Sequence, residues 1–362
     1  MELNAFRSRL KVNYYGLENI CNRGYAPTIY AVNHPTRFDP FIMISSILHY
    51  SDNKNMIRLP AAQWIKEKFH YLYMLKFFDW LAISFVGDDK EKNKLALQQL
   101  EGHLQKYSHI LIFPEGWYQR DGKMRPGMYG TSLLALHYAQ KEEVFIFPVS
   151  ITYDMKPRPK KRELVQSFCN VLWNFDEYLL DTIVEAKQYY HAELDINFGK
   201  PLSVLQIKQQ GAGLDEAGVR RLVTTTMMKE IGHLLVINSN QLLAQYLLQG
   251  YASEKRVYEK EAILDDILSL GTQLQQKGYY VKPNLENALE QTLQLFQDEH
   301  ILGRKKISGI EKYIIDKNCK WHFEKIPDPL DNDFKEKNFL HYTANQINHL
   351  DEVCHLIEQR WQ

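Results

Sequence analysis

Short apolar runs alternate with mixed apolar and charged stretches in the first half of the chain. The runs at 28–32, 110–113 and 144–147 have the length and the β-branched or aromatic content of buried strands. Residues 90–104 place leucines on one face of a helix and charges on the other, and a second helix is predicted over 129–140. Strands that alternate with helices predict an α/β fold, with a mostly parallel sheet flanked by helices.

Three further segments of this half are less regular. Residues 195–198 are predicted as a strand that ends in Gly-Lys-Pro, and residues 54–59 as a weak, short strand. The stretch 69–86 is dense in aromatic residues but contains Lys76 and Asp79, which argue against a membrane span. We interpret this stretch as a core helix that runs into a strand; the alternative is a surface that dips into the lipid interface.

The pattern changes after Gly211-Ala212-Gly213, where a boundary is expected. We predict an N-terminal domain over 1–210 and a mainly helical C-terminal domain over 211–362. In the second domain, helices are predicted at 214–235, 239–249, 254–276, 285–298 and 341–360, and an irregular segment at 304–340.

Composition narrows the class of protein. The 362 residues are 45% hydrophobic and 24% charged, which is ordinary for a globular chain. Lys+Arg and Asp+Glu both number 44, so the chain lacks the basic excess of a nucleic-acid binder. The four cysteines are far apart and no export signal is visible, which favours a reducing, cytoplasmic setting. No run of about 18 apolar residues occurs, so no membrane span is predicted.

Chemically useful side chains follow the predicted strands. The first strand leads to His34 and Asp39, the second to Glu115, and the third to Pro148. Because the carboxyl ends of parallel strands meet at one edge of a sheet, an active site is predicted at that edge. Asp39 can bond one imidazole nitrogen of His34 and leave the other to act as a base. The alternative for His34 is an ordinary strand-to-helix turn with a polar side chain.

These residues stand in an order that resembles a known enzyme family. Asn33-His34-Pro35-Thr36-Arg37-Phe38-Asp39 is similar to the first motif of the glycerolipid acyltransferases. Phe113-Pro114-Glu115-Gly116 is similar to the third motif, and 147–154 to the fourth. The resemblance covers residues 12–205 and implies the glycerolipid acyltransferase fold. Residues 234–244 and 340–350 more faintly resemble stretches of glycerol-3-phosphate and dihydroxyacetone-phosphate acyltransferases.

The resemblance implies an O-acyltransferase. Such an enzyme moves a fatty acyl group from acyl-CoA or acyl carrier protein to a hydroxyl of a glycerol phosphate or lysophospholipid, with His34 as general base oriented by Asp39. The implied acceptor-binding residues are Glu115, Gly116, Arg120 and Arg37. No cofactor and no metal is implied. The alternative is a catalytically weak or inactive, membrane-associated lipid-binding protein with the same fold.

The chain departs from the family pattern where cations would hold a phosphate. Asp88 stands where the second motif usually has an arginine. Trp117-Tyr118-Gln119 replaces a common Thr-Arg-Ser, and Met128 replaces an expected lysine. The cations that could bind a phosphate instead are Arg120, Lys123, Arg125 and Arg58.

Two surface features complete the expectations. Peripheral contact with the inner face of a membrane is expected from the aromatic stretch 69–85 and from the cations within 156–162. A zinc site built from Cys319, His322, Cys354 and His355 is disfavoured, because their helical, leucine-rich surroundings are typical of ordinary structural side chains.

Overall fold

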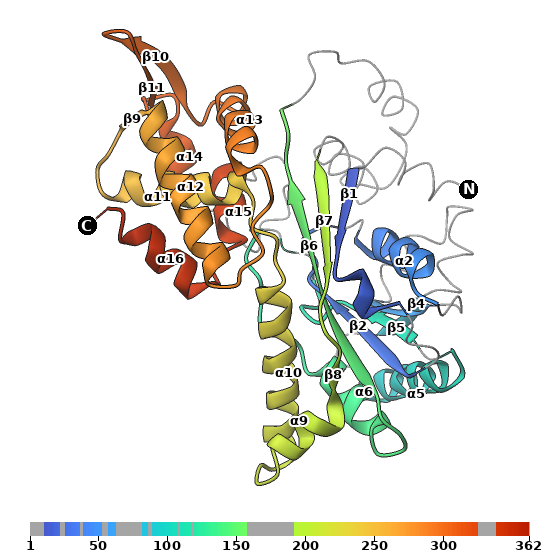
Figure 1. Ribbon diagram of the computed structural model, residues 1–362. Coiled ribbons are helices and arrows are strands. Elements are labelled where there is room, and N and C mark those ends of the chain that lie inside the picture. Colours follow the sequence, from blue (N-terminus) through green and yellow to red (C-terminus); the bar gives the residue numbers. More distant parts are fainter. Residues whose placement is uncertain are drawn as a thin grey trace.

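A twisted sheet with helices on both faces stands beside a mainly helical C-terminal part (Figure 1). This arrangement comes from a computed structural model, which describes residues 11–21, 26–36, 39–52, 57–62, 82–85, 89–107, 109–117, 119, 121–157, 192–324 and 338–361. The predicted fold class is confirmed: a mostly parallel sheet is flanked by helices and followed by a helical region.

The elements follow one another in an alternating order. The strands of the first half are β1 (Lys11–Tyr15), β2 (Thr28–Val32), β3 (Leu59–Ala62), β4 (Ala82–Phe85), β5 (His109–Ile112), β6 (Phe145–Asp154), β7 (Glu193–Phe198) and β8 (Leu202–Ser203). The helices of this half are η1 (Leu17–Asn19), α2 (Asp39–Tyr50), α5 (Lys90–Tyr107), α6 (Gly130–Tyr138), α9 (Val204–Gln210) and α10 (Glu216–His233). The later elements are α11 (Ser239–Ala252), β9 (Val257–Glu259), α12 (Lys260–Gln276), α13 (Leu285–Asp298), β10 (Gly303–Ile307), β11 (Ile310–Ile314), α14 (Lys320–Glu324), α15 (Phe339–Asn345) and α16 (Asp351–Glu358).

The main sheet has the strand order β1-β7-β6-β2-β5, and β8 adds to β6. β2 lies between β5 and β6 and pairs with both in parallel. β7, the predicted strand at 195–198, is antiparallel to β6, so the sheet is mixed at that junction. The carboxyl ends of β2, β5 and β6 therefore lie at the same edge of the sheet, as the predicted active site requires.

The central strand β2 is buried on both faces, which explains its unbroken apolar sequence. Alternate residues of β2 point to opposite faces. Tyr30 and Val32 pack in a cluster with apolar side chains of α2. Ile29 and Ala31 pack in another cluster with those of α5, α6 and α10. The strand that precedes His34 is thus fixed from both sides.

The C-terminal part has its own hydrophobic core, built from α11, α12, α13, α15 and α16. α10 still packs on the main sheet, because its apolar residues up to Ile231 join the cluster that contains β2 and β5. Ile237 is the first residue that joins the C-terminal cluster. The domain boundary expected near 210 stays a prediction. The chain passes from the hydrophobic cluster of the main sheet to that of the C-terminal part between Ile231 and Ile237.

Three predictions about the second half are wrong in detail. The helix predicted over 254–276 begins at Lys260, because residues 257–259 form the strand β9. The segment predicted as irregular contains a hairpin of β10 and β11, which forms a three-stranded sheet with β9. Its strands escaped notice because most of β10 is exposed and cationic, so no apolar alternation marks it. The helix predicted over 341–360 is two helices, α15 and α16, because the chain turns at 346–350.

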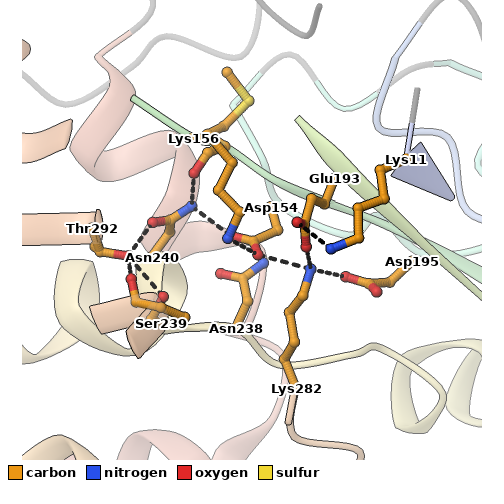
Figure 2. Close-up of polar contacts among 12 residues, drawn as sticks. Lys11, Asp154, Lys156, Glu193, Asp195, Asn238, Ser239, Asn240, Lys282 and Thr292 are labelled. Carbon is orange, nitrogen blue, oxygen red and sulfur yellow. Dashed lines mark hydrogen bonds and ion pairs between the residues drawn. The ribbon is translucent and has the colours of Figure 1, made fainter. Parts of the chain in front are cut away.

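A buried lysine joins the C-terminal part to the main sheet. Lys282 is 6% exposed, and its Nζ lies 2.8 Å from Asp154 Oδ2, 2.9 Å from Glu193 Oε2 and 2.9 Å from Asp195 Oδ2 (Figure 2). These four residues are called the Lys282 cluster below. Two further lysines, Lys156 and Lys11, bind Asp154 and Glu193. The cluster fixes the end of β6 and the start of β7 against the segment before α13.

The Lys282 cluster predicts a dependence of stability on pH. Burial alone would raise the pKa of Glu193, but hydrogen bonds from Lys11 and Lys282 and the charges of Lys282 and Lys156 lower it to about 2. The unfolded chain then binds more protons, so Glu193 stabilises the folded state above its ordinary pKa of 4.5 and loses this effect as the pH falls towards 2. Urea unfolding of wild type and Glu193→Gln should give a difference that shrinks over this range. A difference independent of pH would contradict the assignment.

Candidate active site

His34 lies just past the end of β2, and Asp39 begins α2. His34 Nδ1 lies 3.0 Å from Asp39 Oδ2, and the side chains are 15% and 0% exposed, respectively. A carboxylate accepts hydrogen bonds, so this contact places the ring proton on Nδ1 and the lone pair on Nε2. The predicted pairing of His34 with Asp39 is present, and the His34 side chain is partly exposed to solvent.

Asp39 is held by three donors besides His34. Its Oδ2 accepts the Thr36 backbone N–H at 2.7 Å. Its Oδ1 accepts the Thr36 hydroxyl at 2.7 Å and the Tyr153 hydroxyl at 2.8 Å. Tyr153 comes from β6, the parallel neighbour of β2. Four hydrogen bonds on two oxygens leave the carboxylate little freedom to rotate, so it presents a fixed acceptor to the imidazole.

The predictions missed Thr36 and Tyr153. Thr36 lies inside the His34–Asp39 motif, where a hydroxyl three residues before a carboxylate at a helix start could have suggested a local hydrogen bond. Tyr153 lies in the run 147–154 that the sequence singled out, but its partner lies on another element. Only the pairing of β2 with β6 brings Tyr153 to Asp39.

The start of the His34 loop is anchored by Asn33. The Asn33 amide donates to the Ile151 carbonyl at 3.0 Å and accepts the Ile151 N–H at 2.7 Å. The ring of His34 stacks on Phe113, with the centroids 4.2 Å apart. The two contacts fix the backbone before His34 and the plane of its ring, which is what a general base needs for alignment with a substrate.

Glu115 is buried beneath the loop rather than open to the surface, at 3% exposed. Its Oε1 accepts the His34 backbone N–H at 3.2 Å and the Gln119 amide at 2.8 Å, and its Oε2 accepts the Arg125 backbone N–H at 2.8 Å. Burial raises the pKa of Glu115, and these N–H donors together with His34 oppose that rise. Glu115 therefore ties the His34 loop to the segment 119–125. Binding of an acceptor hydroxyl by this carboxylate stays a prediction.

Gly116 has the backbone geometry that its position demands. Its φ of +75° lies in the left-handed region, and its N–H closes a turn onto the Phe113 carbonyl at 3.0 Å. A Cβ at this position would stand 2.3 Å from Met128 Sδ. Any side chain here would strain the turn that presents Glu115 to the His34 loop.

Three of the four predicted phosphate-binding cations lie within the described residues, and their role stays a prediction. Arg125 pairs with Asp121 at 3.2 Å, and the backbone N–H of Lys123 donates to the same carboxylate at 3.1 Å. Arg58 lies beside β5, where its backbone carbonyl accepts the Leu111 N–H at 2.9 Å. The fourth candidate, Arg120, and the predicted acceptor-binding residue Arg37 lie outside the described residues.

Large apolar side chains are exposed near Gly116, and one of them, Met128, stands where the family pattern has a lysine. Trp117 and Met128 are 52% and 59% exposed, and Tyr129 is 52% exposed. Met128 contacts the Gly116 position, and its backbone N–H donates to the Pro114 carbonyl at 2.7 Å. Trp117, Met128 and Tyr129 are called the apolar rim below. Large exposed apolar side chains beside a candidate site are typical of surfaces that bind apolar ligands or lipid.

The other candidate features have these outcomes. Within the described ranges, no group of three or more His, Cys, Asp or Glu side chains is arranged to hold a metal ion. Cys319 lies against the Ile314 carbonyl and Cys354 against Gln245, so these two residues of the disfavoured zinc site have other neighbours. No helix among the described residues is long and apolar enough to span a bilayer. Most of the stretches 69–85 and 156–162 lies outside the described residues.

Comparisons with known proteins match the first part of the chain to one family. Residues 11–152 match the profile of a family described as Acyltransferase. Among solved structures, the chain is similar to the 1-acyl-sn-glycerophosphate (LPA) acyltransferase PlsC from Thermotoga maritima, at 17% sequence identity and a TM-score of 0.39. That match covers 64% of this chain and 77% of the PlsC chain. No curated protein matches the chain.

Proposed function

Because residues 11–152 belong to the acyltransferase family, we propose that the chain transfers a fatty acyl group from a thioester to a hydroxyl of a lysophospholipid or glycerol phosphate. The thioester is acyl-CoA or acyl carrier protein. The observation that carries the proposal is the contact of 3.0 Å between His34 Nδ1 and Asp39 Oδ2, at the edge where parallel strands end. This contact supports a fixed tautomer of His34, whose side chain is partly exposed to solvent.

The proposed step is direct transfer. His34 Nε2 takes the proton of the acceptor hydroxyl while the oxygen attacks the thioester carbonyl carbon. Asp39 stabilises the imidazolium that forms. The tetrahedral intermediate then expels the thiolate, the carbon–sulfur bond breaks, and the thiolate takes the proton from the imidazolium. The products are an ester and a thiol, and His34 returns to its starting state without an acyl-enzyme.

The apolar rim supports a lysophospholipid as the acceptor. An acceptor with an acyl chain offers apolar surface to Trp117, Met128 and Tyr129, whereas glycerol phosphate offers none. In the family pattern, a lysine stands at the position of Met128 and an arginine stands among the residues after Gly116, and these cations are implied to hold a phosphate. Peripheral contact with the inner face of a membrane, where such acceptors reside, is part of the same proposal.

The proposal is tested by mass spectrometry of products formed from acyl-CoA or acyl carrier protein with separate lysophospholipid and glycerol phosphate acceptors. We expect a preference for lysophospholipids, and Met128→Lys should reduce this preference about tenfold by removing apolar contact and adding a phosphate-binding charge. Leu95→Lys is the matched control, since Leu95 is 57% exposed on α5, outside the apolar rim.

Three outcomes would count against parts of the proposal. Equal effects of Met128→Lys and Leu95→Lys would remove the apolar rim from acceptor choice. A preference for glycerol phosphate would reverse the assigned acceptor. Binding of lysolipid without any loss of thioester or formation of product would favour the alternative, an inactive lipid-binding protein with this fold.

A further inference from the structure

The C-terminal helix α15 contacts both loops of the candidate active site, although it lies far away in the sequence. The Tyr342 hydroxyl donates to the Pro35 carbonyl at 3.1 Å, next to His34. The Asn345 amide donates to the Asp121 carbonyl at 2.8 Å. One face of α15 therefore carries a hydrogen bond to the His34 loop and another to the segment that follows Glu115.

The backbone of the loop that contains Asp121 and Gly122 also passes close to the backbone of α15. Gly122 has a φ of +80°, and a Cβ there would stand 2.0 Å from the Tyr342 carbonyl oxygen. The loop can pass α15 at this distance because residue 122 is glycine. Three residues later, the Arg125 backbone N–H donates to Glu115, whose other oxygen accepts the His34 N–H. The second route from α15 thus also ends at His34.

The Tyr342 hydroxyl and Asp39 bind the same peptide group, the one between Pro35 and Thr36. The Pro35 carbonyl and the Thr36 N–H belong to one planar peptide group, so fixing one of them orients the other. The Thr36 N–H is the donor that lies 2.7 Å from Asp39 Oδ2. A single rigid unit is thus held by Tyr342 on one side and by the Asp39 carboxylate on the other.

α15 is a firm support for this unit. Leu340 and Ala344 are fully buried in the C-terminal core. Asn338 caps the helix by accepting the His341 N–H at 3.3 Å. Just past its end, Gln346 accepts the Gln241 amide of α11 at 2.7 Å. A helix held at both ends can fix the position of a hydroxyl better than a loop can.

We propose that Tyr342 is a positioning residue of the active site, and that the C-terminal region completes this site by fixing the peptide that binds Asp39. The inference rests on the proposed function in one respect only, namely that His34 is the base. Without the Tyr342 hydroxyl the Pro35–Thr36 peptide can tilt, and the alignment of Asp39 with His34 relaxes. The chemical step slows, while the donor thioester binds as before.

The test compares Tyr342→Phe with Tyr258→Phe. Both variants keep the ring and remove a hydroxyl from a buried tyrosine of the C-terminal part; Tyr258 donates to the Lys255 carbonyl at 3.2 Å. We expect kcat to fall about tenfold in Tyr342→Phe with the KM for the thioester within about twofold. Tyr258→Phe should keep the wild-type kcat. The two thermal midpoints should fall by similar amounts.

Two more measurements separate positioning from general stability. In a His34→Ala background, Tyr342→Phe should not lower the residual rate further, because it acts through His34. Hydrogen exchange of peptides that contain 33–36 and 121–125 should rise in Tyr342→Phe and stay unchanged in Tyr258→Phe. Additive effects on the rate, or equal kcat values in the two tyrosine variants, would overturn the proposal.

The exchange measurement does not depend on activity. If the wild type transfers no acyl group, the proposed function fails, and exchange alone decides whether Tyr342 positions the loops. Faster exchange confined to Tyr342→Phe would then still support the structural part of the proposal. Unchanged exchange in the two loops would refute it, whatever the wild-type activity.

Discussion

His34→Ala is expected to lower kcat for acyl transfer by about 10²–10⁴-fold, the usual contribution of a positioned general base. An acceptor hydroxyl is a poor nucleophile near neutral pH, and no other described residue combines a ring nitrogen bonded to a buried carboxylate with a position at the strand ends. Asp39 cannot replace His34, because it is fully buried and its two oxygens accept four hydrogen bonds. The measurement is product formation under saturating donor and acceptor.

The control for this experiment is His355→Ala. His355 lies exposed on α16, where it contacts Gln359 at 2.8 Å, away from both loops. Its replacement should leave kcat within about twofold of wild type and should keep the fold, because surface substitutions usually change the free energy of unfolding by about 0.5 kcal/mol or less. Wild-type activity of a folded His34→Ala variant would exclude His34 as the base, and with it the proposed step.

Lys282→Met is expected to lower the free energy of unfolding by about 3–5 kcal/mol at pH 7, because it leaves buried carboxylates without their shared cation. Asp154 and Asp195 are fully buried, and Lys282 Nζ lies within 2.9 Å of both. Lys156 and Lys11 still neutralise part of the negative charge of the cluster, because they pair with Asp154 and Glu193. The expected loss of stability therefore stays within about 3–5 kcal/mol rather than above it. Urea unfolding followed by circular dichroism measures the difference.

Lys277→Met provides the comparison for a lysine in the same region. Lys277 pairs with Glu352, but the two side chains are 42% and 44% exposed. An exposed ion pair is worth about 0–1 kcal/mol, so this variant should unfold close to wild type. Equal losses in the two lysine variants would mean that the Lys282 cluster stabilises no more than a surface pair does.

The sequence predicted the features that depend on local patterns. Continuous apolar runs located β2, β5 and β6, and their shared edge followed from the rule for parallel strands. The His34–Asp39 contact was predicted because five residues at a strand-to-helix turn suffice to bring a carboxylate back to an imidazole. The buried position of Glu115 was not predicted, because its N–H partners belong to 119–125 and to the His34 loop.

The features that were missed depend on contacts between distant segments. Tyr153 reaches Asp39 only through the pairing of two strands that are separated by more than a hundred residues. The antiparallel direction of β7 was not predicted, because the direction of a strand in a sheet depends on its pairing partner, here β6, which lies far away in the sequence. Residues 340–350 drew attention only by a faint resemblance, and nothing in them indicated that Tyr342 would meet Pro35.

The sequence separation of Pro35 and Tyr342 also affects the order in which parts of the chain can fold. They are 307 residues apart, so their contact closes almost the longest loop the chain can form. The strands of the main sheet are synthesised well before α15 and can pair before it exists. The strands of the main sheet can therefore pair at a point when the two loops of the candidate active site do not yet have the contacts with α15.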